Sequence, residues 1–190
     1  MRPHLMTGFL RQHLIAHFSQ PDQIEHYNLR EYLWRAEIER SKILIESLTQ
    51  WKPENAGTRP AILIRRNAWQ NQRVGIGDYL QGATIIEGHD RYSTIMQGSH
   101  TIFCLTTAPG ECETLAAEVY RELLQFGPVI RETLSLMRFV LTEIGQMKPV
   151  LEAREHYAVP VTVAYAHTED WIIRRHAPVL DHIELSEFRP

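Results

Sequence analysis

The chain has 190 residues, with 20 lysines and arginines against 23 aspartates and glutamates, and a formal net charge of −3. Its length suits one domain with extensions, and the absence of any lysine-rich or arginine-rich block argues against a protein that grips nucleic acid non-specifically. No apolar run reaches membrane-spanning length, and two cysteines cannot build a disulfide framework. We therefore expect a soluble intracellular product, without membrane contact, in which Cys104 and Cys112 are free thiols.

Two helices are predicted at the amino terminus. Apolar residues recur at three and four positions from Leu5 to Phe18, which is typical of a short amphipathic helix. The segment from Asn28 to Trp51 places apolar residues among charged ones and ends before Pro53, which predicts a second, longer helix. We assign residues 1–27 to an N-terminal helical extension.

The middle of the chain alternates strand and loop signals. "AILIRR", Ala61–Arg66, predicts a short strand. The segment from Asn67 to Arg91 is rich in Asn, Gln and Gly, so we expect a long loop that is mobile in the free subunit and that orders against a partner. The run from Tyr92 to Thr107 predicts one long strand with a bulge at Gly98.

A helix is predicted next, with Pro109 and Glu111 in its first turn and a buried stripe along one side. We expect a second short helix within 127–137, a strand within 138–150 and a last strand within 156–171. The predicted stripe consists of Leu115, Ala116, Val119, Leu123 and Leu124.

This order of elements predicts an α+β fold with a mainly antiparallel β-sheet and helices packed on one face. We place the core at residues 28–170. Residues 171–190 form a predicted C-terminal docking arm, because they mix apolar anchors such as Trp171 and Phe188 with charges around Pro178.

The motifs of catalysis and metal binding are incomplete. His13 and His17 are four apart, but Leu14 and Ile15 stand where a metalloprotease motif needs glutamate, so we interpret the two as ordinary, partly buried histidines. Ser99 and His100 are neighbours in a strand and point to opposite faces. The spacing of Gly75, Gly77 and Gly82 matches no phosphate-binding loop, and the polar cluster Arg174–His182 is interrupted by a proline. We predict no catalytic residue, metal or cofactor.

The strand "VPVTVAYA" has two unlike faces. Val159, Val161, Val163 and Tyr165 alternate with a smooth face of small residues, Ala158, Pro160, Thr162, Ala164 and Ala166. The bulky face is suited to a core, whereas a small apolar face lets a second backbone approach closely. Either another protein or this chain's own N-terminal helices would cover it. Pro160 predicts that the strand lies at a sheet edge or carries a bulge.

In its order of elements the chain resembles the tail-terminator and neck proteins of tailed bacteriophages. The resemblance covers roughly Asn28 to Asp170 and rests on "AILIRR", "GSHTIFCLTT", "ETLAAEVYRELLQF", "RFVLTEI" and "VPVTVAYA". It implies an α+β structural protein of the virion, assembled in the host cytoplasm into a ring, commonly a hexamer. Such a ring meets connector and tail-tube proteins and lets genomic DNA pass through its lumen.

The expected interface residues combine the smooth face with aromatic residues of the loop and the arm. They are Ala158, Thr162, Ala164, Ala166, Trp69, Tyr79, Trp171 and Phe188. Three alternatives stay open: a neck adaptor ring on the portal, an α+β enzyme that uses the Arg174–His182 cluster, and a small ligand-binding domain whose glycine-rich loop closes over its ligand.

Overall fold

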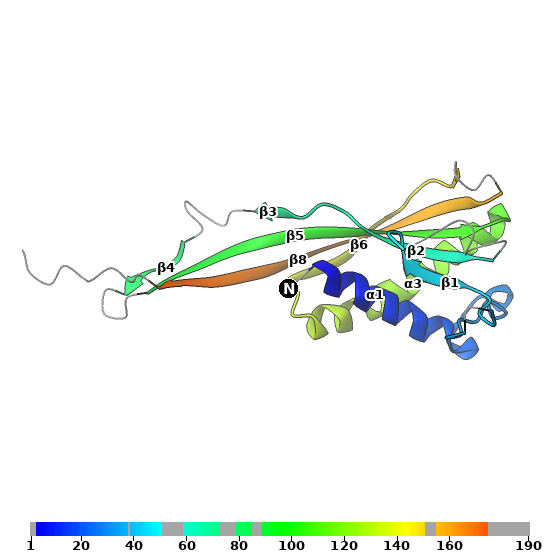
Figure 1. The fold of residues 1–190 in the computed structure, drawn as a ribbon, viewed down its shortest axis with the longest axis horizontal. Helices are drawn as coiled ribbons and strands as arrows, with labels where there is room; N and C mark the ends of the chain where they lie inside the picture. The colour runs from blue at the N-terminus through cyan, green and yellow to red at the C-terminus, as the bar shows by residue number, and fades with distance from the viewer. Residues whose placement is uncertain are drawn as a thin grey trace, which may run out of the picture.

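The computed structural model describes residues 3–37, 39–50, 59–72, 79–84, 89–150 and 155–174, and it confirms the predicted α+β fold. One twisted β-sheet carries two long α-helices on the same face and extends well beyond them as a narrow ribbon (Figure 1). None of the helices in these ranges is both long and apolar enough to cross a membrane.

The described residues form an eight-stranded sheet in which β1, β2, β5, β8 and β6 lie side by side in that order. The short strands β3 and β4 pair with β5, and β7 pairs with β8. All these pairings are antiparallel except that of β1 with β2. The bounds are β1 Leu44–Ser47, β2 Ala61–Arg66, β3 Gln70–Gln72, β4 Tyr79–Thr84, β5 His89–Thr106, β6 Arg138–Ile144, β7 Lys148–Pro149 and β8 Tyr157–Arg174.

Strands β5 and β8 are the two long central strands of the sheet. Each has 18 residues, and their pairing is unbroken from His89 opposite Arg174 to Thr106 opposite Tyr157. At about 3.3 Å per residue such a pair is about 60 Å long. The pairing of β5 with β8 continues through Gly98 without a bulge, so the predicted bulge is wrong there. The register shifts instead on the other edge of β5, where Arg66 lies opposite His100 but Gln70 lies opposite Gln97.

Both long helices pack on one face of the sheet. Helix α1 spans Pro3–Phe18, helix α3 spans Pro109–Thr133, and two short 3-10 turns, η1 Pro21–Gln23 and η2 Tyr27–Leu29, follow α1. Each large apolar side chain buried between the layers contributes about 1.5–3 kcal/mol to folding. The first helix is therefore part of the core, although it precedes the predicted core in sequence. The main core includes Leu10, Leu14, Phe18, Ile62, Ile64, Ile102, Leu115, Val119, Leu123, Val159, Val161 and Val163.

The helix predicted from Asn28 to Trp51 is wrong. The chain forms η2, a series of turns and then strand β1, which pairs with β2. Within that stretch Ile43 and Ile45 are buried toward the helices while Leu44 is buried on the opposite face of the sheet. This alternation is the period of a strand, and pairing with a buried neighbour outweighs the helix propensity of the charged residues around it.

The segment predicted as a loop from Asn67 to Arg91 contains strands β3, β4 and the start of β5. The long edge of β5 explains the difference, because its unpaired N–H and C=O groups offer a template for neighbouring backbone. The intervening residues 73–78 and 85–88 lie outside the described ranges, so the predicted mobility stays a prediction.

Helix α3 begins as predicted, with Pro109 and Glu111 in its first turn, but the expected break after Phe126 is wrong. The helix continues through Pro128, which removes one N–H from the ladder. That loss falls on the solvent side, because Pro128 is exposed and Leu124, four residues earlier, is 57% exposed. Leu124 was expected in the buried stripe, whereas Leu115, Ala116, Val119 and Leu123 are buried there.

Strand β8 continues beyond Asp170, so the predicted start of the C-terminal arm at 171 falls inside a strand. Residues 175–190, including Phe188 and the rest of the polar cluster from Arg175 to His182, lie outside the described ranges.

Candidate interaction face and a buried ion network

The two faces of β8 differ as the sequence predicts. Val159, Val161, Val163 and Tyr165 are buried. Both α1 and α3 contribute to the same core cluster as these residues, so the N-terminal helix covers the bulky face. The alternative that this chain's N-terminal helices cover the smooth face is therefore wrong.

The smooth face belongs to a wider surface that we call the open face. Ala158, Thr162, Ala164 and Ala166 are half-buried there, and in the described part of the chain no helix packs on them. Ser99 and Val140 lie opposite Ala164 on the neighbouring strands, and Gln97 and Arg138 lie opposite Ala166. These strand positions line a shallow hollow of about 320 Å³.

Pro160 does not mark a sheet edge, because β8 lies between β5 and β6. The carbonyl of Pro160 accepts a hydrogen bond from the N–H of Gly145 at 2.7 Å. In an extended strand the N–H and C=O of a residue point to the same neighbour, so the missing N–H of Pro160 faces the end of β6. The pairing of β6 is irregular there, between Leu141 and Glu143, which is how an interior strand tolerates the proline.

The two tryptophans among the predicted interface residues lie away from the open face. Trp69 is on the helix side, where its indole N–H donates a 3.0 Å hydrogen bond to the hydroxyl of Tyr165. Trp171 is 38% exposed on the ribbon and stacks on Tyr92 with ring centroids 5.6 Å apart. Tyr79 belongs to β4, but its side chain lies outside the described part. The structure thus brings together Ala158, Thr162, Ala164 and Ala166, and separates the two tryptophans from them.

Ser99 and His100 point to opposite faces, as predicted. Ser99 is on the open face, where its hydroxyl accepts a hydrogen bond from the amide of Asn67 at 3.1 Å. His100 is fully buried under α1, and its Nε2 lies 2.8 Å from the hydroxyl of Thr7. Burial, followed by the charge of Arg66, lowers the pKa of His100 to about 4, so this imidazole is neutral at pH 7.

The two cysteines are free, as expected, and both are buried. The thiol of Cys112 donates to the carbonyl of Cys104 at 3.0 Å. Burial raises the pKa of both thiols above the ordinary value, so the reactive thiolate is disfavoured and both side chains act as small core residues.

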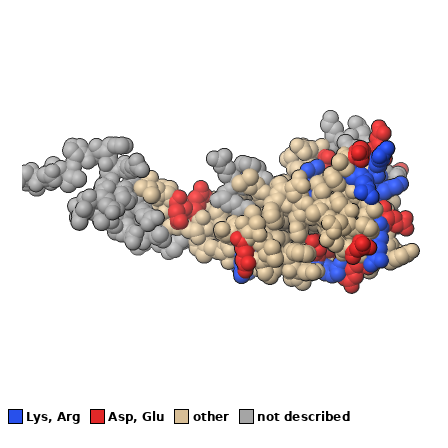
Figure 2. All heavy atoms as spheres, turned by 90° about the horizontal axis from the view of Figure 1, so that it is seen from below, with Lys and Arg blue, Asp and Glu red and all other residues tan. Residues whose placement is uncertain are grey.

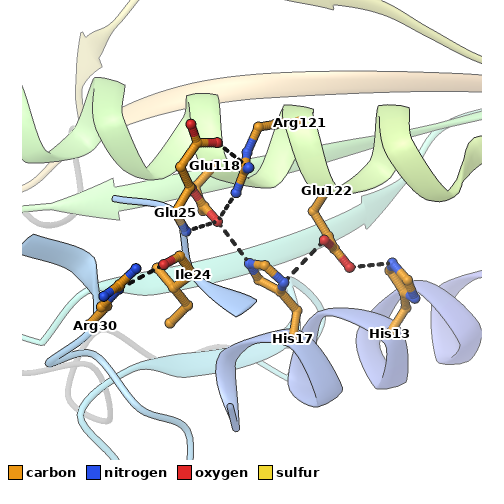
Figure 3. Close-up of polar contacts among 8 residues, drawn as sticks. All are labelled: His13, His17, Ile24, Glu25, Arg30, Glu118, Arg121 and Glu122. Carbon is orange, nitrogen blue, oxygen red and sulfur yellow. Dashed lines mark hydrogen bonds and ion pairs between the residues drawn. The ribbon is translucent and has the colours of Figure 1, made fainter. Parts of the chain in front are cut away.

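A chain of ionisable side chains joins α1 to α3 (Figure 3). His17 lies between two carboxylates: its Nε2 is 3.1 Å from Glu118 Oε1, and its Nδ1 is 3.1 Å from Glu122 Oε2. The other oxygen of Glu122 is 3.0 Å from His13 Nε2. Arg121 binds both Glu118 and Glu25, and the N–H of Glu25 also donates to Glu118. We call these six residues the ion network.

The ion network holds its charges through mutual contact. Burial disfavours the imidazolium of His17, but the hydrogen bonds and charges of Glu118 and Glu122 outweigh it and raise the pKa to about 9. Burial likewise disfavours both carboxylates, yet hydrogen bonds from His17 and Arg121 lower the pKa of Glu118 to about 2, and hydrogen bonds from His13 and His17 lower that of Glu122 to about 2. At pH 7 His17 therefore carries a proton on each ring nitrogen and donates to two carboxylates.

The partial burial predicted for His13 and His17 is correct for His13, whereas His17 is buried almost completely. Sequence analysis missed their glutamate partners. The missed signal was a matching spacing, because Glu118 and Glu122 are also four apart on a helix and lie beside the buried stripe. The histidine nitrogens contact the glutamate oxygens directly. The described residues contain no group of three side chains that could hold a metal ion.

Charged side chains are unevenly distributed on the helix side. Figure 2 shows lysines, arginines and acidic residues mixed together at the end of the body away from the ribbon, while much of the middle of this face is uncharged.

No protein-family model matches the chain, and a search of curated proteins finds no match.

Proposed function

We propose that this chain is a non-enzymatic structural protein of a tailed bacteriophage that assembles into a ring at the head–tail junction, as a tail terminator or neck protein. The ring, a hexamer in this proposal, contacts connector and tail-tube proteins, and genomic DNA passes through its lumen. The protein is assembled in the host cytoplasm and functions in the virion.

The open face is the observation that carries this proposal. A sheet surface exposed to water usually presents long polar side chains, whereas Ala164 and Ala166 present methyl groups beside a hollow and Ala158 packs on a small apolar cluster of the same face. Desolvating these methyl groups costs little, and their lack of bulk lets a neighbouring backbone come close between Gln97 and Arg138, which border the hollow. Both properties are those of a surface that contacts protein.

The ribbon supports assembly in a second way. Strand β6 pairs with β8 only as far as Ala166, so in the described ranges no strand lies beside that edge of β8 from His167 to Arg174. An unpaired edge is a template for a strand of another chain. The paired strands β5 and β8 are about 60 Å long, so the ribbon at the end that carries this edge reaches well beyond the core.

Replacing Ala164 with arginine is expected to block ring assembly and leave the fold intact. The substitution places a charge in the hollow of the open face, where a subunit contact would desolvate it without a partner. Assembly is measured by mass photometry, and folding by circular dichroism.

The matched control is Gln125→Arg, which adds the same charge to an exposed position of α3 on the other side of the sheet. This variant should assemble like the wild type. Normal rings from natively folded Ala164→Arg protein would place the interface elsewhere. Neighbouring genes test the wider proposal, since a locus without capsid, portal and tail-tube genes would contradict a phage function.

A further inference from the structure

A concave pocket lies where α1 approaches the carboxyl ends of β1 and β2. It has a volume of about 690 Å³ and is separate from the hollow of the open face. Three arginines line it: Arg11 from α1, and Arg65 and Arg66 from the end of β2. Several hundred cubic ångströms is the usual size of a small-ligand site.

The positive charges of this arginine pocket have no acidic counterpart in the described part of the chain. No aspartate or glutamate there lines the pocket, and none of the three arginines forms an ion pair with a described carboxylate. Arg11 donates instead to the carbonyl of Ile45 at 3.1 Å, a contact that positions its guanidinium without neutralising it. The guanidinium of Arg65 lies 4.9 Å from the centre of the Phe103 ring, on the face of the sheet opposite α1, so Arg65 lines the pocket without directing its charge into it.

The remaining polar groups of the pocket can all donate hydrogen bonds. Thr7, Ser47 and Thr49 contribute hydroxyls, and Gln50 contributes an amide. The charge of Arg66 also acts on the buried His100, which contacts Thr7. Together with burial, which has the larger effect, it lowers the pKa of His100. Guanidinium groups surrounded by hydroxyls match the several acceptor oxygens and the double negative charge of a phosphate better than they match a single carboxylate.

We propose that this arginine pocket binds the phosphate group of a nucleic-acid backbone or of a small phosphorylated ligand. Arg11 and Arg66 approach the anion from opposite walls, one on the helix and one on the sheet, and the hydroxyls complete its hydrogen bonds. The inference does not rest on the proposed ring, because the pocket is formed within one chain and lies away from the open face. A chain that never forms rings can still bind phosphate here.

The test measures binding of two probes to the full chain. One probe is pyrophosphate, followed by isothermal titration calorimetry. The other is a fluorescein-labelled single-stranded oligonucleotide, followed by anisotropy at several salt concentrations. For at least one probe, the double substitution Arg11→Gln/Arg66→Gln should weaken binding at least about tenfold, because it removes two charge-assisted hydrogen-bonding groups. If the oligonucleotide binds, the salt dependence of its affinity should also fall by about one unit of slope for each phosphate that is no longer neutralised.

The control is Arg40→Gln/Arg131→Gln, which makes the same change in net charge at two exposed sites outside the pocket and should retain wild-type affinity. Oligonucleotide binding that pyrophosphate does not displace identifies a backbone site. Pyrophosphate binding without oligonucleotide binding identifies a small phosphorylated ligand. Equal binding by the natively folded pocket variant and the control variant overturns the proposal, as does the absence of binding to both probes.

Discussion

Replacing His17 with alanine should lower the free energy of unfolding by about 3–5 kcal/mol, the usual loss when one partner of a buried ion pair is removed. His17 is 1% exposed and donates to both Glu118 and Glu122. Without it, Arg121 still neutralises Glu118, but Glu122 keeps only His13. The loss is measured by urea denaturation at pH 6.

Two further variants identify the cause of that loss. Gln12→Ala changes an exposed residue of the same helix and should alter stability by less than about 0.5 kcal/mol. The variant His17→Leu/Glu118→Gln/Glu122→Leu removes most of the buried charge and should recover much of the stability, because apolar packing often replaces a buried ion pair without loss. A decrease below about 1 kcal/mol for His17→Ala would show that the ion network contributes little to stability.

The stabilisation of the fold by the ion network should decrease both at acidic and at alkaline pH. The pKa of His17 rises from 6.5 to about 9, so its stabilisation is complete below pH 6.5 and is lost as the pH rises toward 9. The pKa of Glu118 and of Glu122 falls from 4.5 to about 2, so their stabilisation is present above pH 4.5 and is lost as the pH falls toward 2. The difference in stability between wild type and His17→Ala should therefore be largest between pH 4.5 and 6.5. A difference that does not change with pH would contradict this.

Replacing Gly98 with alanine should cost about 1–3 kcal/mol, the usual range for overpacking a well-packed site. A Cβ at this position would lie 2.6 Å from Trp69 Nε1 and 2.8 Å from Cζ of Tyr165. Either ring must move, which breaks the hydrogen bond between them. Thermal unfolding measures the cost, and a change in the tryptophan fluorescence spectrum should accompany it.

Gly8→Ala is the matched control and should have the opposite effect. A Cβ at Gly8 meets nothing within 4 Å, and the position is inside α1. Alanine there should stabilise the protein by about 0.5–1 kcal/mol through helix propensity. In a Trp69→Leu background the penalty of Gly98→Ala should shrink, and an unchanged penalty would exclude the tryptophan as its cause.

The sequence by itself determined the elements whose signals are local. The helical periodicity from Leu5 to Phe18, the first turn of α3 at Pro109, and the alternation of large and small residues in β8 each identify an element. These signals depend on backbone geometry and on capping within a few residues, so they are readable without knowing the neighbours. They were also sufficient to predict the α+β class and the two unlike faces of β8.

Only the tertiary structure decided which elements meet. Strand β1 exists because β2 lies beside it, and Pro160 is accommodated in an interior strand because β6 ends at Ile144, one residue before Gly145. His17 meets Glu118 across 101 residues, and the matching spacings on the two helices do not by themselves show that the two pairs meet. It was likewise the packing of α1 beside α3 on one face that left the open face without a helix in the part of the chain that the structure describes. Strand pairing and burial depend on residues distant in sequence, and their free energies exceed the local preferences of a charged segment or a single proline.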